Sequence, residues 1–356
     1  MAPKAPKISV IMPAYNVEGY VQRAVESLQQ QTLTNFELLV VDDGSTDRTG
    51  AILDALEMRD TRITVFHTPN AGAPAARNFA LDKARGSYVM FMDADDWADN
   101  HMLEDMYTYA VKHGLELVIS GFYIDTYYGR DNQFTTEIKH CDTKVFSSRD
   151  EFRLFAYRLF NENQLYTPWN KLFLRERIEA IHARFRNTFW DDFPFVLDYI
   201  RDCEKVGVLS QPYYHFIRAR KESETARWRK DMYQKREEEH AWMCDLYQHW
   251  NLHDEPHAFE MIQRRYIERL IGCIENVCNP ACTLSVPQKL QHIKDMISTP
   301  QAQKAVMFAH PRSKMMELML VPIRRKNARL CYQEGKFISF VKRHNAHLFA
   351  LLKARR

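Results

Sequence analysis

Short apolar runs alternate with helical patterns along roughly the first 121 residues of the chain. Five runs have the length and composition of buried strands: Ile8–Met12, Phe36–Val41, Ile63–His67, Tyr88–Met92 and Leu115–Gly121. Apolar residues recur at helical spacing in the segments between them: Glu18–Gln31, the residues after Asp47, Pro74–Ala84 and Asp99–His113. This alternation predicts an α/β fold, in which a mostly parallel central sheet carries helices on both faces.

Polar or acidic clusters directly follow three of these strands, at residues 13–16, 42–47 and 93–96. In a parallel sheet, ligands bind beyond the carboxyl ends of the strands. We therefore expect the three clusters to meet at one edge of the sheet, far apart though they are in sequence.

The segment after this alternation is less regular. Residues 123–146 are polar and aromatic, which indicates irregular structure or antiparallel edge strands. Helices are expected over Ser147–Asn161 and Asp191–Ile200, and a turn into a short strand is expected at Thr167–Phe173.

After about Arg227 the pattern is helical and charged, with breaks at Asn279-Pro280 and Thr299-Pro300. The change of pattern predicts two domains. The first is an α/β domain over residues 1–225, with halves 7–121 and 122–225, and the second is a mainly α-helical C-terminal region over residues 226–356.

Charge is unevenly distributed along the chain. Residues 311–356 contain 12 Lys and Arg against 2 Asp and Glu, a net charge of +10, so the total of +3 leaves −7 for the first 310 residues. A basic tail on an acidic body indicates an anionic surface as partner. Phe337–Leu352 can form a basic amphipathic helix, either lying in the plane of an anionic membrane or packed on the body of the protein.

Composition places the chain among soluble globular proteins, with 46% hydrophobic and 27% charged residues. No apolar run approaches the ~18 residues of a membrane span. The seven cysteines are scattered without a CxxC pair. We interpret them as reduced thiols of a cytoplasmic protein rather than as a disulfide framework.

The acidic clusters suggest two kinds of ligand. Carboxylates at Asp93, Asp95 and Asp96 suit Mg²⁺ or Mn²⁺, which retain open positions for substrate phosphates, although the same residues can simply begin the next helix. Asp42 and Asp43 can accept hydrogen bonds from a base or a ribose, or form a turn and a helix cap.

Two further residues near these clusters have candidate roles. Arg77 can pair with a phosphate or with Asp42 and Asp43, or it is an ordinary solvated helix residue. Tyr15, just past the first strand, can stack on a base or be a partly buried aromatic at the edge of the sheet.

Together these segments resemble the inverting family 2 glycosyltransferases of the GT-A type, with the match strongest over residues 7–125. The residues that carry it are Ser9–Asn16, Val41–Asp47, Asn70–Gly72, Ala76–Asn78, Gly86 and Phe91–Asp96. The resemblance implies a Rossmann-like GT-A fold and a nucleotide-sugar donor, most often a UDP-sugar. It also implies that the donor diphosphate is bridged by Mn²⁺ or Mg²⁺, which neutralises charge on the leaving group.

The resemblance also assigns roles to individual residues. The Pro13 backbone, Tyr15 and Asp42 or Asp43 would hold the base, Arg77 would lie near the diphosphate, Asp93 would bind the ribose and Asp95 the metal.

Inversion needs a base that takes the proton of the acceptor hydroxyl. The acidic pair Asp191-Asp192, after the aromatic Phe189-Trp190, matches the family pattern for it. We assign Asp192 as the base and Asp191 as its neighbour, with their order nearly open. The alternative is a helix N-cap followed by a charge that the helix dipole favours.

Three more residues match family segments. Trp169 would line the acceptor cleft, or belongs to the core. His215 and Arg218 would lie near the diphosphate, with a structural role for His215 as the alternative.

The function expected is a metal-dependent inverting transferase that moves a sugar to a hydroxyl of a glycan or lipid-linked glycan in bacterial surface polysaccharide biosynthesis. It would work in the cytoplasm, with the basic tail on the inner face of the plasma membrane. A sugar nucleotidyltransferase is the second enzyme hypothesis, but the Gly-rich phosphate loop is missing after the first strand. An adaptor for membranes or nucleic acid would leave the carboxylates without a role, and no nucleic-acid partner is expected.

Overall fold

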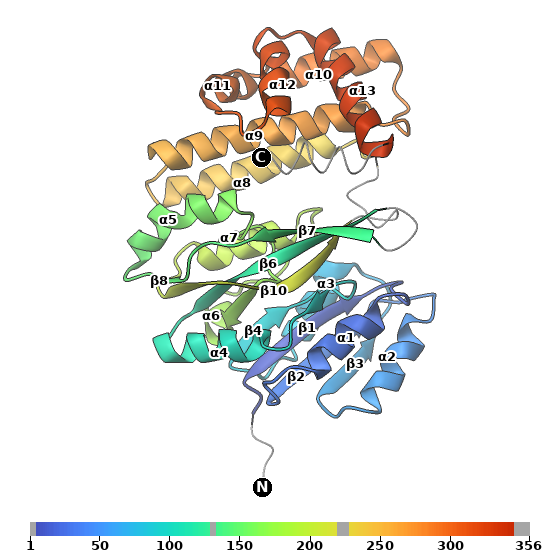
Figure 1. Ribbon diagram of the computed structural model, residues 1–356, viewed down its shortest axis with the longest axis vertical. Coiled ribbons are helices and arrows are strands. Elements are labelled where there is room, and N and C mark those ends of the chain that lie inside the picture. Colours follow the sequence, from blue (N-terminus) through green and yellow to red (C-terminus); the bar gives the residue numbers. More distant parts are fainter. Residues whose placement is uncertain (1–4, 129–132, 219–227, 345–356) are drawn as a thin grey trace. The chain divides into compact units, whose positions relative to one another are not determined.

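The computed structural model describes residues 5–128, 133–218 and 228–344, which form two compact units (Figure 1). The first unit comprises residues 5–127 and 134–218, and the second is the helical unit of residues 228–344. The domain boundary expected near residue 225 lies in 219–227, outside the described residues.

The first unit is built on a ten-stranded sheet with the order β3-β2-β1-β4-β9-β6-β10-β5, to which β7 adds beside β6 and β8 beside β10. The strands are β1 (Ile8–Ala14), β2 (Phe36–Asp42), β3 (Ile63–His67), β4 (Tyr88–Phe91), β5 (Trp97–Ala98), β6 (Leu117–Tyr128), β7 (Gln133–Lys139), β8 (Lys144–Val145), β9 (Lys171–Leu174) and β10 (Val206–Arg218).

The four strands from β3 to β4 run parallel, as the sequence predicts. The short strand β9 is antiparallel to both β4 and β6, so it joins this parallel half to a second parallel pair, β6 and β10. The strand expected at Leu115–Gly121 continues as β6 to Tyr128, because its polar and aromatic residues pair with β10 and β7.

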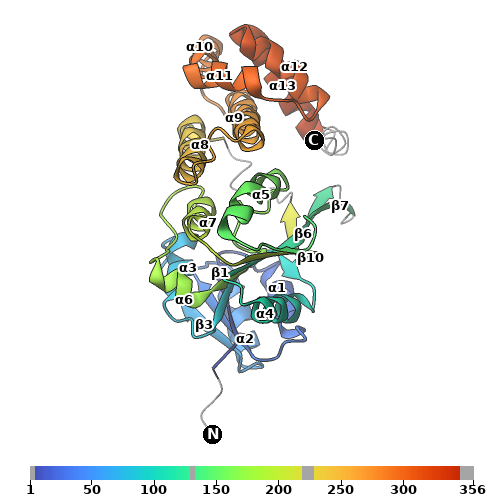
Figure 2. The ribbon, with the colours of Figure 1, turned by 90° about the vertical axis from the view of Figure 1, so that its left-hand side faces the viewer.

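Helices cover both faces of the sheet (Figure 2). They are α1 (Val21–Gln29), α2 (Thr49–Glu57), α3 (Ala73–Leu81), α4 (Met102–His113), α5 (Arg149–Asn161), α6 (Arg175–Ala180) and α7 (Asp192–Ile200). Alternate residues of β1, such as Val10 and Met12, pack with buried residues of α1 and α4. On the other face, Phe91 of β4 packs edge-on against Phe195 of α7 at 5.3 Å between ring centroids. The predicted α/β fold is confirmed.

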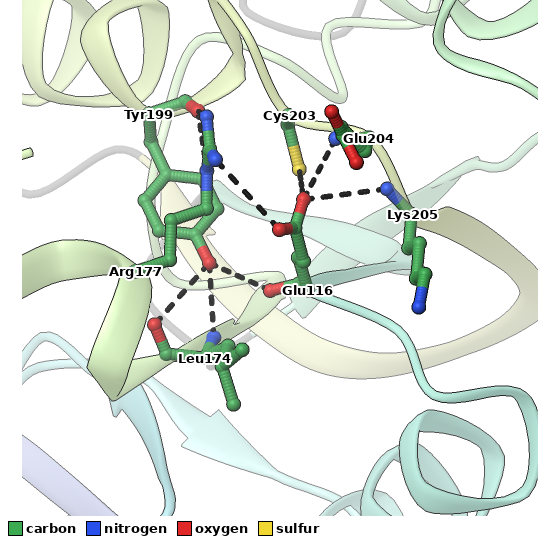
Figure 3. Close-up of polar contacts among 7 residues, drawn as sticks. All are labelled: Glu116, Leu174, Arg177, Tyr199, Cys203, Glu204 and Lys205. Carbon is green, nitrogen blue, oxygen red and sulfur yellow. Dashed lines mark hydrogen bonds and ion pairs between the residues drawn. The ribbon is translucent and has the colours of Figure 1, made fainter. Parts of the chain in front are cut away.

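Glu116, just before β6, contacts the residues just before β10 (Figure 3). These amino-terminal strand ends lie at the edge of the sheet opposite the acidic clusters. Its Oε2 accepts hydrogen bonds from the thiol of Cys203 and the N–H groups of Glu204 and Lys205, at 3.3, 2.7 and 3.3 Å. The Tyr199 hydroxyl donates to the Glu116 carbonyl at 2.6 Å. Burial raises the pKa of Glu116, but the three donors to Oε2 and the charge of Arg177 outweigh burial and lower the pKa below its ordinary value.

The second unit is helical. Its helices are α8 (Met232–His249), α9 (Pro256–Val277), α10 (Val286–Ser298), α11 (Pro300–Phe308), α12 (Lys314–Arg324) and α13 (Ala328–His344). Both predicted breaks are confirmed, because α9 ends before Asn279-Pro280 and Thr299 separates α10 from α11. The end of the predicted amphipathic helix, residues 345–352, lies outside the described residues.

Two expectations from composition can be compared with the structure. All seven cysteines are free thiols, and six of them are buried. In the part of the chain that the structure describes, no helix combines the length and the hydropathy that crossing a bilayer requires.

Candidate active site

The loops that follow β1, β2 and β4 lie at one edge of the sheet. β1 is the middle strand of the three, and Ala14 at its end pairs with Asp42 at the end of β2, while Ile11 pairs with Phe91 at the end of β4. The backbone N–H of Asp43 donates to the Ala14 carbonyl at 2.9 Å. The predicted meeting of the three polar clusters is thus confirmed.

Asp43 fixes the start of α3. Its two carboxylate oxygens accept hydrogen bonds from the N–H groups of Ala71 and Gly72, both at 2.8 Å, and its side chain is buried. Gly72 has φ +89°, a left-handed conformation that disfavours residues with a Cβ. The segment Asn70–Gly72 therefore turns sharply into α3, which carries Arg77.

Asp42, also buried, is engaged beside it. Its carboxylate accepts from the Ser45 N–H at 3.1 Å and pairs with Nδ1 of His67 at 2.8 Å. Hydrogen bonds to Asp42 and Asp54 raise the pKa of His67. Tyr15 follows β1 with its side chain 49% exposed, available for stacking, and Pro13 is half-buried within β1.

Arg77 is the centre of the site. It is buried, and its Nη2 donates to Asp93 Oδ1 at 2.8 Å, while Nη1 donates to Asp191 Oδ2 at 2.6 Å and lies 3.2 Å from Asp192 Oδ1. The guanidinium lies over the ring of Phe185 at 5.2 Å. Arg77 thus joins a carboxylate of the loop after β4 to Asp191 and Asp192, the two carboxylates expected to supply the catalytic base.

This arrangement perturbs the proton affinities of the group. Burial lowers the pKa of Arg77, but the charges of Asp192, Asp93 and Asp191 outweigh burial and raise it. Burial raises the pKa of Asp192 to about 7, with repulsion from Asp191 and Asp93 acting in the same direction and Arg77 and Lys171 opposing it. Burial also raises the pKa of Asp191, against the attraction of Arg77.

Asp192 combines a buried oxygen with an accessible side chain. Its Oδ1 is buried and accepts no hydrogen bond from any described residue, although Arg77 lies near it. The side chain as a whole is 25% exposed, so part of it meets solvent. Both aspartates stand at the beginning of α7, where the helix dipole also favours negative charge.

The acidic loop, residues 93–96, contains carboxylates with different surroundings. Asp96 is buried; its Oδ2 accepts from the Tyr214 hydroxyl at 2.7 Å and its Oδ1 from the Ile217 N–H at 2.8 Å. Burial, with the charges of Asp95 and Asp93, raises the pKa of Asp96 well above its ordinary value. Asp93 is paired with Arg77, and Asp95 is half-buried.

The remaining sequence candidates lie toward the other half of the sheet. Trp169 is 4% exposed and stacks on the ring of Tyr214, so it belongs to the core. His215 is held between Trp97 and Tyr123, with ring centroids at 3.5 and 4.2 Å, and its Nδ1 pairs with buried Asp125 at 2.8 Å. Arg218, the last residue of β10, is half-buried.

Comparisons with known proteins identify the family of the chain. The family model "Glycosyl transferase family 2" matches residues 9–181. An uncharacterized glycosyltransferase of Haemophilus influenzae is 30% identical over 239 residues, which cover 65% of this chain and 89% of that protein. The chain belongs to glycosyl transferase family 2.

Other similar proteins of this family are matched over part of their length. Bacillus subtilis EpsJ, an uncharacterized glycosyltransferase, is 31% identical over 59% of this chain, and the match spans 60% of EpsJ. Among solved structures, S. aureus TarS 1–349 in complex with UDP-GlcNAc superposes with a TM-score of 0.63 over 95% of this chain and 91% of that chain, at 20% identity. That likeness supports the fold, which is GT-A.

A metal ion is expected at this family 2 site, and the carboxylates can be tested for it. Within the described residues, no group of three His, Cys, Asp or Glu side chains is arranged to hold one. Mg²⁺ and Mn²⁺ are often bound by one or two carboxylates plus substrate phosphates. A single carboxylate of the acidic loop, residues 93–96, together with the donor diphosphate would be a donor set of this kind.

Sequence reasoning missed two buried polar residues next to the site. Lys171 has its ammonium group buried, donating to the Thr167 carbonyl and to Asn170 Oδ1. Burial lowers the pKa of Lys171 well below its ordinary value, against the attraction of Asp192. Tyr214 contacts the acidic loop through its hydroxyl. Both lie in segments that the sequence singles out, but nothing local indicates which side chain turns inward.

Replacing Arg77 by glutamine should destabilise the protein strongly. Removing one partner of a buried ion pair costs about 3–5 kcal/mol, because the other charges stay buried. The pKa values of Asp191 and Asp192 would rise further, so the loss should grow between pH 5.5 and pH 8 as these groups are forced to ionise.

Urea unfolding at both pH values measures this effect. Arg48→Gln is the matched control, because the Arg48 side chain is 82% exposed and its ion pair with Glu18 is worth less than about 1 kcal/mol. Equal stabilities of the two variants would show that the three carboxylates do not depend on Arg77.

Proposed function

We propose that this family 2 protein transfers a sugar from a nucleotide-sugar donor, a UDP-sugar, to a hydroxyl of a glycan or lipid-linked glycan, with inversion and with a divalent metal. The observation that carries the proposal is the contact of Arg77 with Asp93 at 2.8 Å and with Asp191 at 2.6 Å. It joins the loop expected to hold the donor to the pair expected to supply the base.

The donor would bind along the edge formed by the loops after β1, β2 and β4. Tyr15 would stack on the base beside the Pro13 backbone, and Asp43 would act there mainly by holding Ala71 and Gly72. Asp42, paired with His67, would support the same part of the donor site. Asp93 would meet the ribose. UDP-GlcNAc is the first donor to test, because TarS was crystallised with it.

The diphosphate would lie between Arg77, the acidic loop and the end of β10. Asp95 would hold Mn²⁺ or Mg²⁺ there, and that ion supplies neutralisation of charge on the departing nucleotide diphosphate. Arg218, at the end of β10, is the proposed cationic contact on that side, and His215 lies three residues before it on the same strand.

The acceptor hydroxyl would approach Asp192. As its oxygen forms a bond to the anomeric carbon, the bond from that carbon to the diphosphate oxygen breaks and the hydroxyl proton passes to Asp192. A pKa of about 7 suits this role, because a base works best when its pKa is near the operating pH. Asp191, held at 2.6 Å by Arg77, would orient the pair.

The first test is donor use. The purified protein should release UDP slowly from a UDP-sugar when Mn²⁺ or Mg²⁺ is present, and not in EDTA. UDP-, GDP- and dTDP-sugars should be compared. Release of pyrophosphate from a mixture of UTP and a sugar 1-phosphate would instead indicate a nucleotidyltransferase, and binding of no donor by folded protein would end the proposal.

The second test is the base. Asp192→Asn should keep donor affinity and lower transfer by at least roughly 100-fold, the contribution typical of general base catalysis. Asp198→Asn, farther along α7 and paired with Arg186 at 2.5 Å, is the matched control and should transfer normally.

The same assay has a pH dependence. Because the base must be ionised and the pKa of Asp192 is raised to about 7, transfer should be lost as the pH falls through about 7 and level off above it. Full activity of Asp192→Asn would move the base to Asp191.

We further propose that the helical unit binds anionic lipid through α13. Leu330, Phe337 and Phe340 are exposed, with Phe337 65% exposed, and exposed Arg329 and Lys336 lie beside them. Helical spacing places these apolar residues on a different side of α13 from the buried Cys331 and Ile338. An amphipathic helix that lies in the plane of the membrane and has basic flanks suits an anionic surface. Each basic residue near that surface contributes about 1 kcal/mol to the binding free energy.

Co-sedimentation with phosphatidylglycerol vesicles tests the lipid proposal. The double variant Phe337→Ser with Phe340→Ser should sediment less than the wild type. Met58→Ser, which removes an 82% exposed side chain from α2's C-terminal end, should not change sedimentation. Unchanged sedimentation of the double variant would indicate that the exposed apolar residues of α13 serve another partner.

A further inference from the structure

The acidic loop, residues 93–96, is tied to β10 on both sides of Asp95. Before Asp95, the N–H of Asp93 donates to the Tyr214 hydroxyl at 3.1 Å. After it, the Asp96 carboxylate accepts from the same hydroxyl at 2.7 Å and from the Ile217 N–H at 2.8 Å. The Tyr214 hydroxyl thus accepts one hydrogen bond and donates one, and both go to this loop.

The position of Tyr214 is set by packing. Its side chain is fully buried, and Trp169 stacks on its ring with centroids 4.5 Å apart and planes at 12°. The pairing of β10 with β6 shifts register on both sides of Pro212, just before Tyr214. Such irregularities re-aim side chains near active sites, and proline suits them because it has no N–H to give to the ladder.

β5 continues this connection. Directly after the acidic loop, Trp97 and Ala98 pair antiparallel with His215 and Tyr214. The loop therefore leaves β4, contacts the Tyr214 hydroxyl twice, and then joins the sheet beside the same tyrosine. Asp95 therefore lies between two points at which the chain is hydrogen-bonded to β10.

We infer that Tyr214, seated on Trp169, is a positioning residue that fixes the acidic loop so that Asp95 meets a divalent cation and the donor diphosphate in one orientation. The inference rests on the proposed function, which gives Asp95 that role. The inference also gives Trp169 a role at the site without contact to substrate. Trp169 holds the ring of Tyr214, and the Tyr214 hydroxyl holds the acidic loop.

A pair of neighbouring tyrosines provides the test. Tyr214→Phe removes the hydroxyl and leaves the Asp93 N–H and the Asp96 Oδ2 without this partner. Tyr213→Phe is the matched control, because Tyr213 is also buried on β10 but its hydroxyl donates to Asp105 of α4, at 2.7 Å.

The first measurement is calorimetric binding of UDP with Mn²⁺ and with EDTA, checked by the electron paramagnetic resonance signal of free Mn²⁺. Groups that hold metal ligands in place typically change metal affinity by roughly 10–100-fold. Tyr214→Phe should therefore weaken Mn²⁺-dependent UDP binding at least roughly tenfold, leaving metal-free binding unchanged, while Tyr213→Phe stays near the wild type. Equal affinities of the two variants, or an equal loss with and without Mn²⁺, would overturn the inference.

The second measurement needs no ligand. Hydrogen exchange of residues 93–97 should be faster in Tyr214→Phe than in Tyr213→Phe, and equal exchange would overturn the positioning role. If the wild type binds no nucleotide with Mn²⁺, the proposed function fails, while exchange still decides whether Tyr214 holds the loop.

If Tyr214→Phe does not fold, a milder variant tests the inference. Trp169→Phe keeps an aromatic ring on Tyr214 but loses part of the stacking surface. It should raise loop exchange and weaken Mn²⁺-dependent UDP binding in the same direction, by less. A folded Trp169→Phe protein with wild-type exchange and binding would contradict the inference.

Discussion

The site depends on the electrostatic neutralisation of three partly buried carboxylates by one buried guanidinium. Asp93, Asp191 and Asp192 come from two segments about 100 residues apart, and their charges would repel one another without Arg77. Arginine suits this position because its planar fork offers several donors in fixed directions. The aromatic ring of Phe185 beneath it completes a surrounding from which water is largely excluded.

Asp43 determines where this cation stands. Its carboxylate holds the two N–H groups that precede α3, and Arg77 lies one turn into that helix. Asp43, which is expected to contact the nucleotide base of the donor, thus also helps to position the catalytic pair Asp191 and Asp192. The loop after β2 and the segment that begins α3 are separate in sequence, but together they hold Arg77 in place.

The first half of the fold was predictable because local periodicity and strand ends carry the necessary information. Strands β1 to β4 and the edge where their loops meet follow from apolar runs and the polar residues after them. The partners of Arg77 did not follow. The sequence suggests phosphate, Asp42 or Asp43, whereas Asp42 pairs with His67 and Asp43 with backbone N–H groups. Two of the actual partners, Asp191 and Asp192, lie more than 100 residues from Arg77 in sequence, and such partners leave no local trace.

The second half was less predictable for a physical reason. β9 has only four residues and is antiparallel between two parallel groups, and no periodicity of that length identifies it. The polar and aromatic residues of β6 beyond Gly121 read as irregular because their partners lie on β10 and β7. For Trp169, whose sequence context allowed a cleft or a core position, only packing against Tyr214 distinguishes the two.

The buried thiols give each unit a chemical reporter of its own opening. Burial raises the pKa of Cys141 to about 12 in the first unit, and does the same for Cys273 and Cys331 in the second. A protonated, enclosed thiol is inert toward alkylating reagents until its surroundings separate. Labelling kinetics at these positions therefore read out how often the transferase unit and the helical unit loosen, each independently of the other and without any introduced probe.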